Sequence, residues 1–194
     1  IPEVLNRVIM QAWRNSAPAQ MNIPRDFWTQ VIDVDLPQVV AFERPAGGEQ
    51  AVAEAAKLLS EAKFPVILSG AGVVLAGAIP DLAKLAERLD APVASNYQHN
   101  DSFPGSHPLA VGPLGYNGSK AAMELIRQAD VVLALGTRLN PFSTLPGYGI
   151  DYWPKEAKII QVDINADRIG LTKKVTVGIQ GDAGKVARGI LSQL

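Results

Sequence analysis

The sequence has 194 residues, enough for one domain with a sizeable core but too few for separate cofactor and substrate domains. Its 18 Lys and Arg nearly balance 19 Asp and Glu, so no positive excess favours nucleic acid or an anionic membrane surface as a partner. Cysteine is absent, which excludes disulfides and thiolate sites, and no apolar run approaches the roughly 20 residues of a membrane span. We expect a soluble, cytoplasmic globular protein.

The first 45 residues differ in pattern from the rest. Apolar residues from Leu5 to Ala12 recur at helical spacing, and Gln20–Ile23 predicts a brief strand. Residues 29–45 show no clear periodicity, and Pro45-Ala46-Gly47-Gly48 is typical of a hinge. A lone helix and strand before a linker are a poor start for a compact fold, because the strand has no evident partner.

These features predict the domain organisation. Residues 1–30 are expected to be the tail of a preceding domain that is missing here, 31–45 a linker, and 46–194 the main domain. The brief strand is then expected to be disordered or paired with another molecule.

In the main domain, short apolar strands alternate with amphipathic helices. Such alternation is typical of a parallel sheet covered by helices on both faces. Because crossover connections are right-handed, the expected fold is an α/β, doubly wound, mostly parallel sheet of the Rossmann-like, three-layer α/β/α type. The predicted strands are Val66–Ser69, Val93–Asn96, Val131–Gly136, Ile159–Asp163 and Val175–Ile179, and the helices centre on residues 52–59, 82–89, 122–129 and 187–194.

A glycine turn follows the first of these strands. Gly70-Ala71-Gly72 allows a tight turn and close approach of a phosphate to a helix N-terminus. The next glycine is Gly77, so the dinucleotide pattern fails at its third position, and the second strand ends at Ser95-Asn96 instead of an acidic ribose anchor. The sequence therefore disfavours an oxidoreductase that binds a nicotinamide dinucleotide. The alternative is that the glycines only form the turn.

Two later strands end in residues that suit a ligand. Gly136-Thr137-Arg138 offers an arginine for a phosphate, and Asp163-Ile164 offers a carboxylate for a ribose or adenine group. Ligands of open parallel sheets bind at this carboxyl edge. The alternative is that Arg138 and Asp163 pair with each other or with loop backbone.

Other motifs favour structural interpretations. The glycine-rich segment Gly112–Lys120 fails the P-loop pattern because Ser119 separates Gly118 from the lysine, and Ser119 is expected to cap a helix. His99 and His107 share one loop, with Asp101 nearby, but no nucleophile elbow or metal-ligand spacing accompanies them. Hydrogen bonding is their expected role.

Several segments together resemble the central domain of thiamine diphosphate-dependent enzymes of the acetolactate synthase and pyruvate decarboxylase group. The resemblance covers nearly the whole chain in the family's order. The segments that carry it are Ala19–Asp26, Pro65–Gly72, Asp90–Val93, Phe103–Pro108, Ala129–Arg138, Ile160–Asn165 and Gly181–Ala183.

This resemblance implies a three-domain subunit. A preceding pyrimidine-binding domain would supply the cofactor-activating glutamate, and a third domain would bind Mg²⁺ and thiamine diphosphate through a Gly-Asp-Gly motif. Here Gly181-Asp182 continues with Ala183, so no catalytic residue and no metal ligand is expected in this chain. Its expected partners are the flanking catalytic domains and further copies in a homodimer or homotetramer.

A finer resemblance concerns one branch of the family. Tyr97–Asp101 and Arg138–Pro154 most resemble an acetyltransferase branch that acts on a sulfonated aldehyde. In that branch the thiazolium carbanion attacks the aldehyde carbonyl with the cofactor as electron sink, sulfite leaves, and phosphate captures the acetyl group. The central domain is then expected to have a structural or assembly role.

The resemblance also suggests a nucleotide. Relatives hold FAD or ADP at strand ends that correspond to Gly70–Gly72, Gly136–Arg138 and Asp163-Ile164. Against flavin, the pattern Phe-Asp-Asp-Arg that follows the arginine in acetolactate synthase is here Leu139–Phe142. The alternative to the structural role is thus an adenine-nucleotide-binding regulatory module in an acetolactate synthase-like protein.

Overall fold

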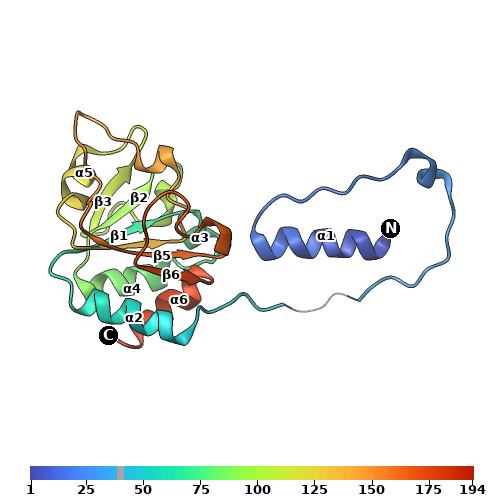
Figure 1. The fold of residues 1–194 in the computed structure, drawn as a ribbon, viewed down its shortest axis with the longest axis horizontal. Coiled ribbons are helices and arrows are strands. Elements are labelled where there is room, and N and C mark those ends of the chain that lie inside the picture. Colours follow the sequence, from blue (N-terminus) through green and yellow to red (C-terminus); the bar gives the residue numbers. More distant parts are fainter. Residues whose placement is uncertain (39–41) are drawn as a thin grey trace. The chain divides into compact units, whose positions relative to one another are not determined.

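The computed structural model describes residues 1–38 and 42–194 (Figure 1). The chain divides into two compact units, Ile1–Arg44 and Pro45–Leu194. The assignment of residues 1–30 to a preceding domain and of 31–45 to a linker stays a prediction.

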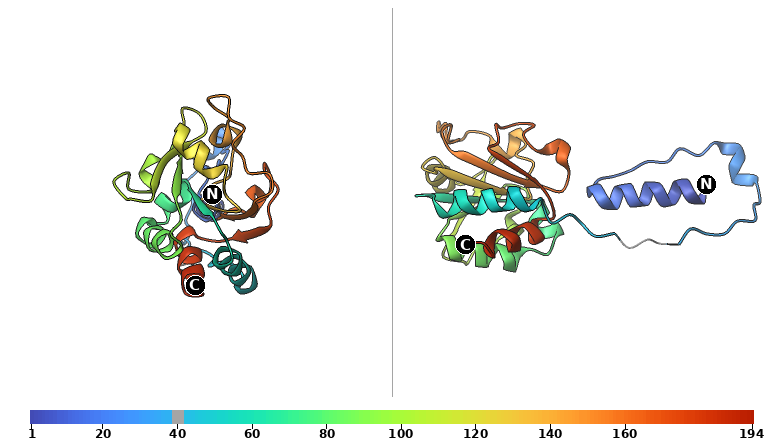
Figure 2. Two further views of the ribbon diagram at one scale, coloured as in Figure 1. Left: turned by 90° about the vertical axis from the view of Figure 1, so that its left-hand side faces the viewer. Right: turned by 60° about the horizontal axis from the view of Figure 1, so that its bottom comes forward.

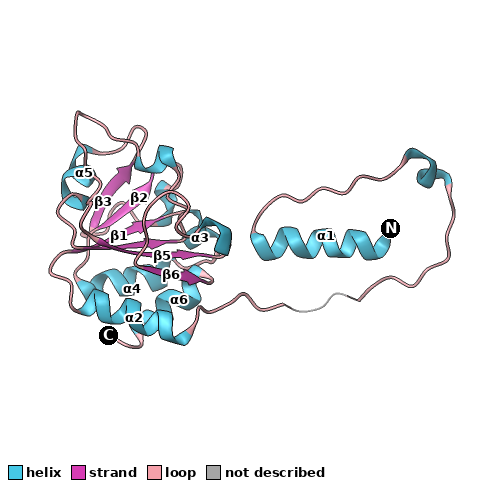
Figure 3. Ribbon diagram, viewed as in Figure 1, coloured by secondary structure: helices cyan, strands magenta, loops and turns pink. Residues whose placement is uncertain are grey.

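The N-terminal unit contains helix α1 (Pro2–Asn15) and the 3₁₀ turn η1 (Arg25–Thr29) (Figure 3). The predicted strand at Gln20–Ile23 is wrong, because these residues have no regular secondary structure. A strand needs a neighbour to satisfy its backbone groups, and no strand is described elsewhere in residues 1–38 or 42–44.

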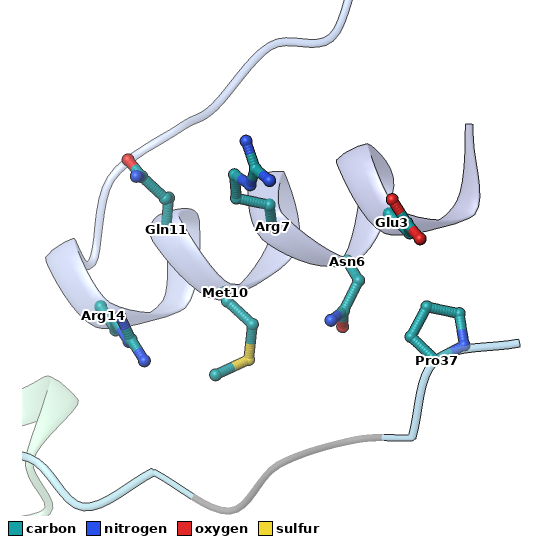
Figure 4. Close-up of a pocket in the computed structure, with 7 residues that line it drawn as sticks. All are labelled: Glu3, Asn6, Arg7, Met10, Gln11, Arg14 and Pro37. Atoms are coloured by element: carbon teal, nitrogen blue, oxygen red, sulfur yellow. The ribbon is translucent and has the colours of Figure 1, made fainter.

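Helix α1 is amphipathic but buries none of its residues. Its apolar side remains open: Leu5, Ile9 and Trp13 are 44%, 56% and 45% exposed. Figure 4 shows polar side chains of α1 near Pro37, where they line a pocket of about 340 Å³. A helix with this pattern ordinarily buries its apolar side against a core.

The second unit alternates strands and helices along its length. Its strands are β1 (Pro65–Ser69), β2 (Val93–Asn96), β3 (Ala110–Leu114), β4 (Val131–Leu135), β5 (Lys158–Asp163) and β6 (Val177–Gln180). Its helices are α2 (Glu49–Ser60), α3 (Ala71–Leu75), α4 (Ile79–Leu89), α5 (Lys120–Ile126) and α6 (Ala183–Leu191), with 3₁₀ turns η2 (Asn100–Ser102), η3 (Pro141–Thr144) and η4 (Ala166–Arg168).

These strands form one six-stranded sheet in the order β3-β2-β1-β4-β5-β6. Every neighbouring pair in it is parallel. The chain therefore winds outward twice from the centre, and the direction of winding changes between β1 and β4. This arrangement confirms the predicted doubly wound α/β fold.

The two faces of the sheet carry different covers, as Figures 1 and 2 show. Ile67 of β1 packs with the apolar sides of α2, α4 and α6, whereas its neighbours Val66 and Leu68 pack with α5 and with Tyr152 of the loop before β5. Successive side chains of a strand point to opposite faces, so a strand buried throughout contributes to both core layers.

Sequence patterns missed β3 and α3. Strand β3 contains Gly112 and Pro113, which normally interrupt a strand, and they are tolerated here because β3 lies at the edge of the sheet. Helix α3 is a single short turn after β1, too brief to show a helical period.

Within the described residues, no helix has both the length and the apolar character that crossing a bilayer requires.

Candidate functional site

The structure brings the predicted site residues to one edge of the sheet. Gly70-Ala71-Gly72 follows β1, Gly136-Thr137-Arg138 follows β4, and Asp163 is the last residue of β5, with Ile164 directly after it. The amide of Gly72 donates to the carbonyl of Gly136 at 2.9 Å, and the amide of Gly136 donates to Val162 of β5 at 3.0 Å. This is the carboxyl edge at the point where the winding direction changes, the common ligand position in such sheets.

Two glycines meet there in direct backbone contact. A Cβ on Gly72 would lie 2.6 Å from the Cα of Gly136, and a Cβ on Gly136 would lie 2.7 Å from the Cα of Gly72. Gly136 also has a φ of +62°, which residues with a side chain adopt only with strain. The glycines thus allow the β1–α3 turn to pack on the chain leaving β4.

Most backbone amides of this turn donate hydrogen bonds to other backbone groups of the protein. Gly70 donates to Leu135 at 3.1 Å, Gly72 donates to Gly136, and Val73 donates back to Gly70 at 3.0 Å. A phosphate cradle needs amides that are free to face the ligand. The geometry therefore favours the turn-former interpretation of Gly70 and Gly72 over a phosphate cradle.

Buried polar side chains tie the loops of this edge together. Asn96, where sequence reasoning noted a missing acidic anchor, donates from Nδ2 to Thr137 Oγ1 at 2.9 Å. Ser69 and Ser102 share a hydrogen bond of 2.6 Å between their hydroxyls. Asn96 Oδ1 is buried and has no partner in the described part of the chain.

Asp163 is a buried carboxylate, 8% exposed. Burial raises its pKa, while the hydrogen bond from the Asn165 amide and the positive charges of Arg168 and Arg138 act in the lowering direction. Its Oδ1 accepts from the Asn165 amide at 2.9 Å. No ion pair between Asp163 and Arg138 occurs within residues 42–194, so loop backbone and not the arginine is its partner.

Sequence reasoning missed Gln161, a buried amide on β5. Its Nε2 donates to the carbonyls of Thr137 and Arg168, each at 3.2 Å, and its Oε1 accepts from the Gly170 amide at 2.9 Å. The side chain thereby joins the loop after β4 to the loop after β5. A polar residue inside the apolar run of β5 was the signal that could have identified it.

Of the two histidines, His107 has the predicted hydrogen-bonding role, whereas the ring of His99 only lies near a carboxylate. His107 Nε2 lies 3.2 Å from Glu87 Oε1, and its Nδ1 accepts from the Leu109 amide at 3.2 Å. His99 lies 3.6 Å from Asp101. Among the described residues no group of three His, Cys, Asp or Glu side chains could hold a metal ion.

Two segments that resemble phosphate- or metal-binding motifs without matching them contain helix caps. The Ser119 hydroxyl accepts from the Ala122 amide at the start of α5, as predicted. The Asp182 carboxylate accepts from the amides of Gly184 and Lys185 at 3.1 and 3.2 Å and caps α6. Asp182 therefore does not fit a Gly-Asp-Gly site for Mg²⁺ and thiamine diphosphate.

The family model of the thiamine pyrophosphate enzyme central domain matches residues 52–190, the span of the sheet and its helices. The chain belongs to the thiamine pyrophosphate enzyme family. This places it among the enzymes that its sequence segments resemble and confirms that expectation.

Relatives of this thiamine pyrophosphate enzyme domain show which members of the family it is most similar to among those compared. A protein of Rhizobium meliloti named probable sulfoacetaldehyde acetyltransferase is 80% identical over 100% of this chain, which covers 33% of its length. The sulfoacetaldehyde acetyltransferase of Roseovarius nubinhibens is 77% identical over 99% of this chain and 32% of its own length. The chain thus spans about a third of these relatives.

A solved structure agrees with the fold. Benzoylformate decarboxylase from Polynucleobacter necessarius superposes with a TM-score of 0.71 over 88% of this chain and 32% of its own, at 24% sequence identity. This likeness concerns the fold of the thiamine pyrophosphate enzyme central domain.

The glycine contact generates a prediction with an internal control. Gly77 has a φ of +61° but nothing within 4 Å of the place that a Cβ would occupy, so Gly77→Ala tests backbone strain alone and is expected to cost about 1 kcal/mol. Gly136→Ala adds the collision with Gly72 and is expected to cost about 1–3 kcal/mol more. Urea unfolding of both variants measures the difference; equal losses would contradict the packing role.

Asp163 generates a prediction about pH. Because burial raises the pKa of Asp163 in the folded state, the protonated carboxyl group favours the folded state. The free energy of unfolding therefore decreases as pH rises through the folded pKa. Asp163→Asn keeps an acceptor for the Asn165 amide and is expected to raise the melting temperature at pH 7. The gain is expected to shrink as pH falls toward the unfolded pKa of about 3.9.

Asp167→Asn, in the same loop but exposed, is the matched control and is expected to show no such pH-dependent gain. A loss of stability in Asp163→Asn at pH 7 would show that the ionised carboxylate stabilises the fold.

Proposed function

We propose that this chain is the central domain of a sulfoacetaldehyde acetyltransferase, an enzyme that converts sulfoacetaldehyde and phosphate into acetyl phosphate and sulfite. The observation that carries the proposal is identity of 77% over 99% of the chain with an enzyme of that name. The acetolactate synthase large subunit of Corynebacterium glutamicum, by contrast, is only 33% identical.

In this proposal the chemistry belongs to the rest of the enzyme. Thiamine diphosphate would supply the electron sink, with Mg²⁺ holding its diphosphate. The described residues fit neither group, because Asp182 is committed to capping α6 and no metal-ligand cluster is present among them. The central domain would instead position the flanking catalytic domains in a cytoplasmic homodimer or homotetramer.

The exposed apolar side of α1 supports the proposed domain organisation. An amphipathic helix that buries nothing lacks the core against which its apolar side would pack. Residues 1–30 as the end of a preceding pyrimidine-binding domain, with 31–45 as linker, would account for it.

The proposed division of labour predicts an inactive fragment. The chain of 194 residues, supplied with thiamine diphosphate, Mg²⁺, sulfoacetaldehyde and phosphate, is expected to release no sulfite. The full-length enzyme under the same conditions is the positive control and is expected to form sulfite and acetyl phosphate in equal amounts. Turnover by the fragment would refute the division of labour, and an inactive full-length enzyme would refute the substrate assignment.

A second candidate function is adenine-nucleotide binding, and the buried Asp163 favours it. A carboxylate kept where burial raises its pKa is a recurrent mark of a binding site. Asp163 would accept from ribose hydroxyls or an adenine amino group, and Arg138 and Arg168, whose charges act on it, would attract the phosphates of ADP or FAD. The turn at Gly70-Ala71-Gly72 would contribute shape more than free amides.

This candidate predicts saturable binding of ADP or FAD to the full-length protein by calorimetry. Asp163→Ala is expected to abolish the binding, and Asp167→Ala, an exposed neighbour, is expected to retain it. No heat from ADP, FAD or coenzyme A would leave the structural role as the only function of the domain.

A further inference from the structure

A chemically labile dipeptide lies in the turn that follows β3. Asn117-Gly118 is the only Asn-Gly pair of the sequence, and it forms the second half of the four-residue turn 115–118, here called the Asn-Gly turn. In such a pair the glycine has no side chain to hinder its own backbone nitrogen, which can attack the side-chain amide of the asparagine. Spontaneous deamidation in an open chain is therefore favoured at this pair.

The backbone geometry of the Asn-Gly turn suits these two residue types. Asn117 has a φ of 54°, in the left-handed region that asparagine adopts more readily than most residues with a side chain. A Cβ on Gly118 would lie 2.8 Å from the carbonyl oxygen and 2.9 Å from the nitrogen of Gly115. The fold thus favours the very dipeptide whose chemistry makes it labile.

The same turn restrains the attacking nitrogen. The Gly118 amide donates to the Gly115 carbonyl at 2.8 Å, so its proton is held and its nitrogen is a poor nucleophile. Gly118 is buried, whereas Asn117 is exposed. Attack requires the turn to open, and the rate of deamidation then follows the population of the open turn.

Two contacts from the connection between β4 and β5 hold the Asn-Gly turn closed. The Tyr148 hydroxyl donates to the Gly118 carbonyl at 3.1 Å, and the Tyr116 amide donates to the Phe142 carbonyl at 2.8 Å. The first contact acts on the residue that carries the nucleophile. Tyr148 is 67% exposed, so its hydroxyl can be removed without disturbing the core.

We propose that Asn117 is a deamidation site that the hydrogen bond from Tyr148 to Gly118 keeps closed. When the turn opens, the Gly118 nitrogen bonds to the side-chain carbonyl carbon of Asn117, its proton goes to the departing amide nitrogen, and ammonia leaves. Water then adds to either carbonyl of the resulting cyclic imide and opens it to aspartate or isoaspartate. Either product adds a negative charge, and isoaspartate also lengthens the main chain of the turn.

Peptide mapping of the full-length protein by mass spectrometry tests the proposal. Wild type, Tyr148→Phe and Tyr116→Phe are incubated side by side at mildly alkaline pH, in buffer and in urea, and deamidation of the peptide that contains Asn117 is followed with time. Tyr116→Phe is the matched control, because it removes an exposed hydroxyl from the turn itself but leaves the contact between Tyr148 and Gly118 intact.

In buffer, Tyr148→Phe is expected to deamidate at Asn117 about fivefold faster than wild type, the factor by which losing a hydrogen bond of ordinary strength raises the population of the open turn. Tyr116→Phe is expected to match wild type, and wild type is expected to react faster in urea than in buffer.

Three outcomes would overturn the proposal. Equal rates for wild type in buffer and in urea would show that the turn gives no protection. Equal rates for the three proteins in buffer would show that Tyr148 does not control the site. An acceleration in Tyr148→Phe that extends to Asn100, an exposed asparagine outside the turn, would assign it to global unfolding.

Discussion

Direct contact between the backbones of Gly72 and Gly136 is the constraint on which the rest of the domain depends. These residues follow the two central strands, β1 and β4, at the point where the sheet changes its winding direction. Because neither has a Cβ, the turn after β1 and the chain leaving β4 can hydrogen-bond to each other across the carboxyl edge. Gln161 and Asn96 then fasten the neighbouring loops to the same point.

The same contacts occupy part of the edge at which sheets of this type ordinarily bind ligands. The carboxyl edge, which in many α/β proteins opens onto a ligand, is here occupied by internal contacts on its β1 side. Asp182, in the segment that resembles a cofactor motif, caps a helix. What remains available at this edge is the buried carboxylate of Asp163 and the exposed aromatic side chains beyond β3 and β4.

The sequence predicted the parts of the molecule whose physics is local. Strands buried on both faces appear as unbroken apolar runs, and the cap at Ser119 follows from its position before a periodic segment. Strand β3 escaped notice because its edge position, which tolerates Pro113, is a property of the assembled sheet. Three other features could not be predicted because they depend on segments that are distant in the sequence. They are the contact between the glycines, the amide contacts of Gln161 and the backbone partner of Asp163.

Pro113 has a further consequence for how this domain associates. Proline lacks the amide hydrogen that an incoming strand would need, and the register of β3 against β2 also shifts between Val93 and Ala94. The outer side of β3 is thus a poor template for adding strands from another molecule. Extension of the sheet by a further strand is therefore disfavoured on that flank.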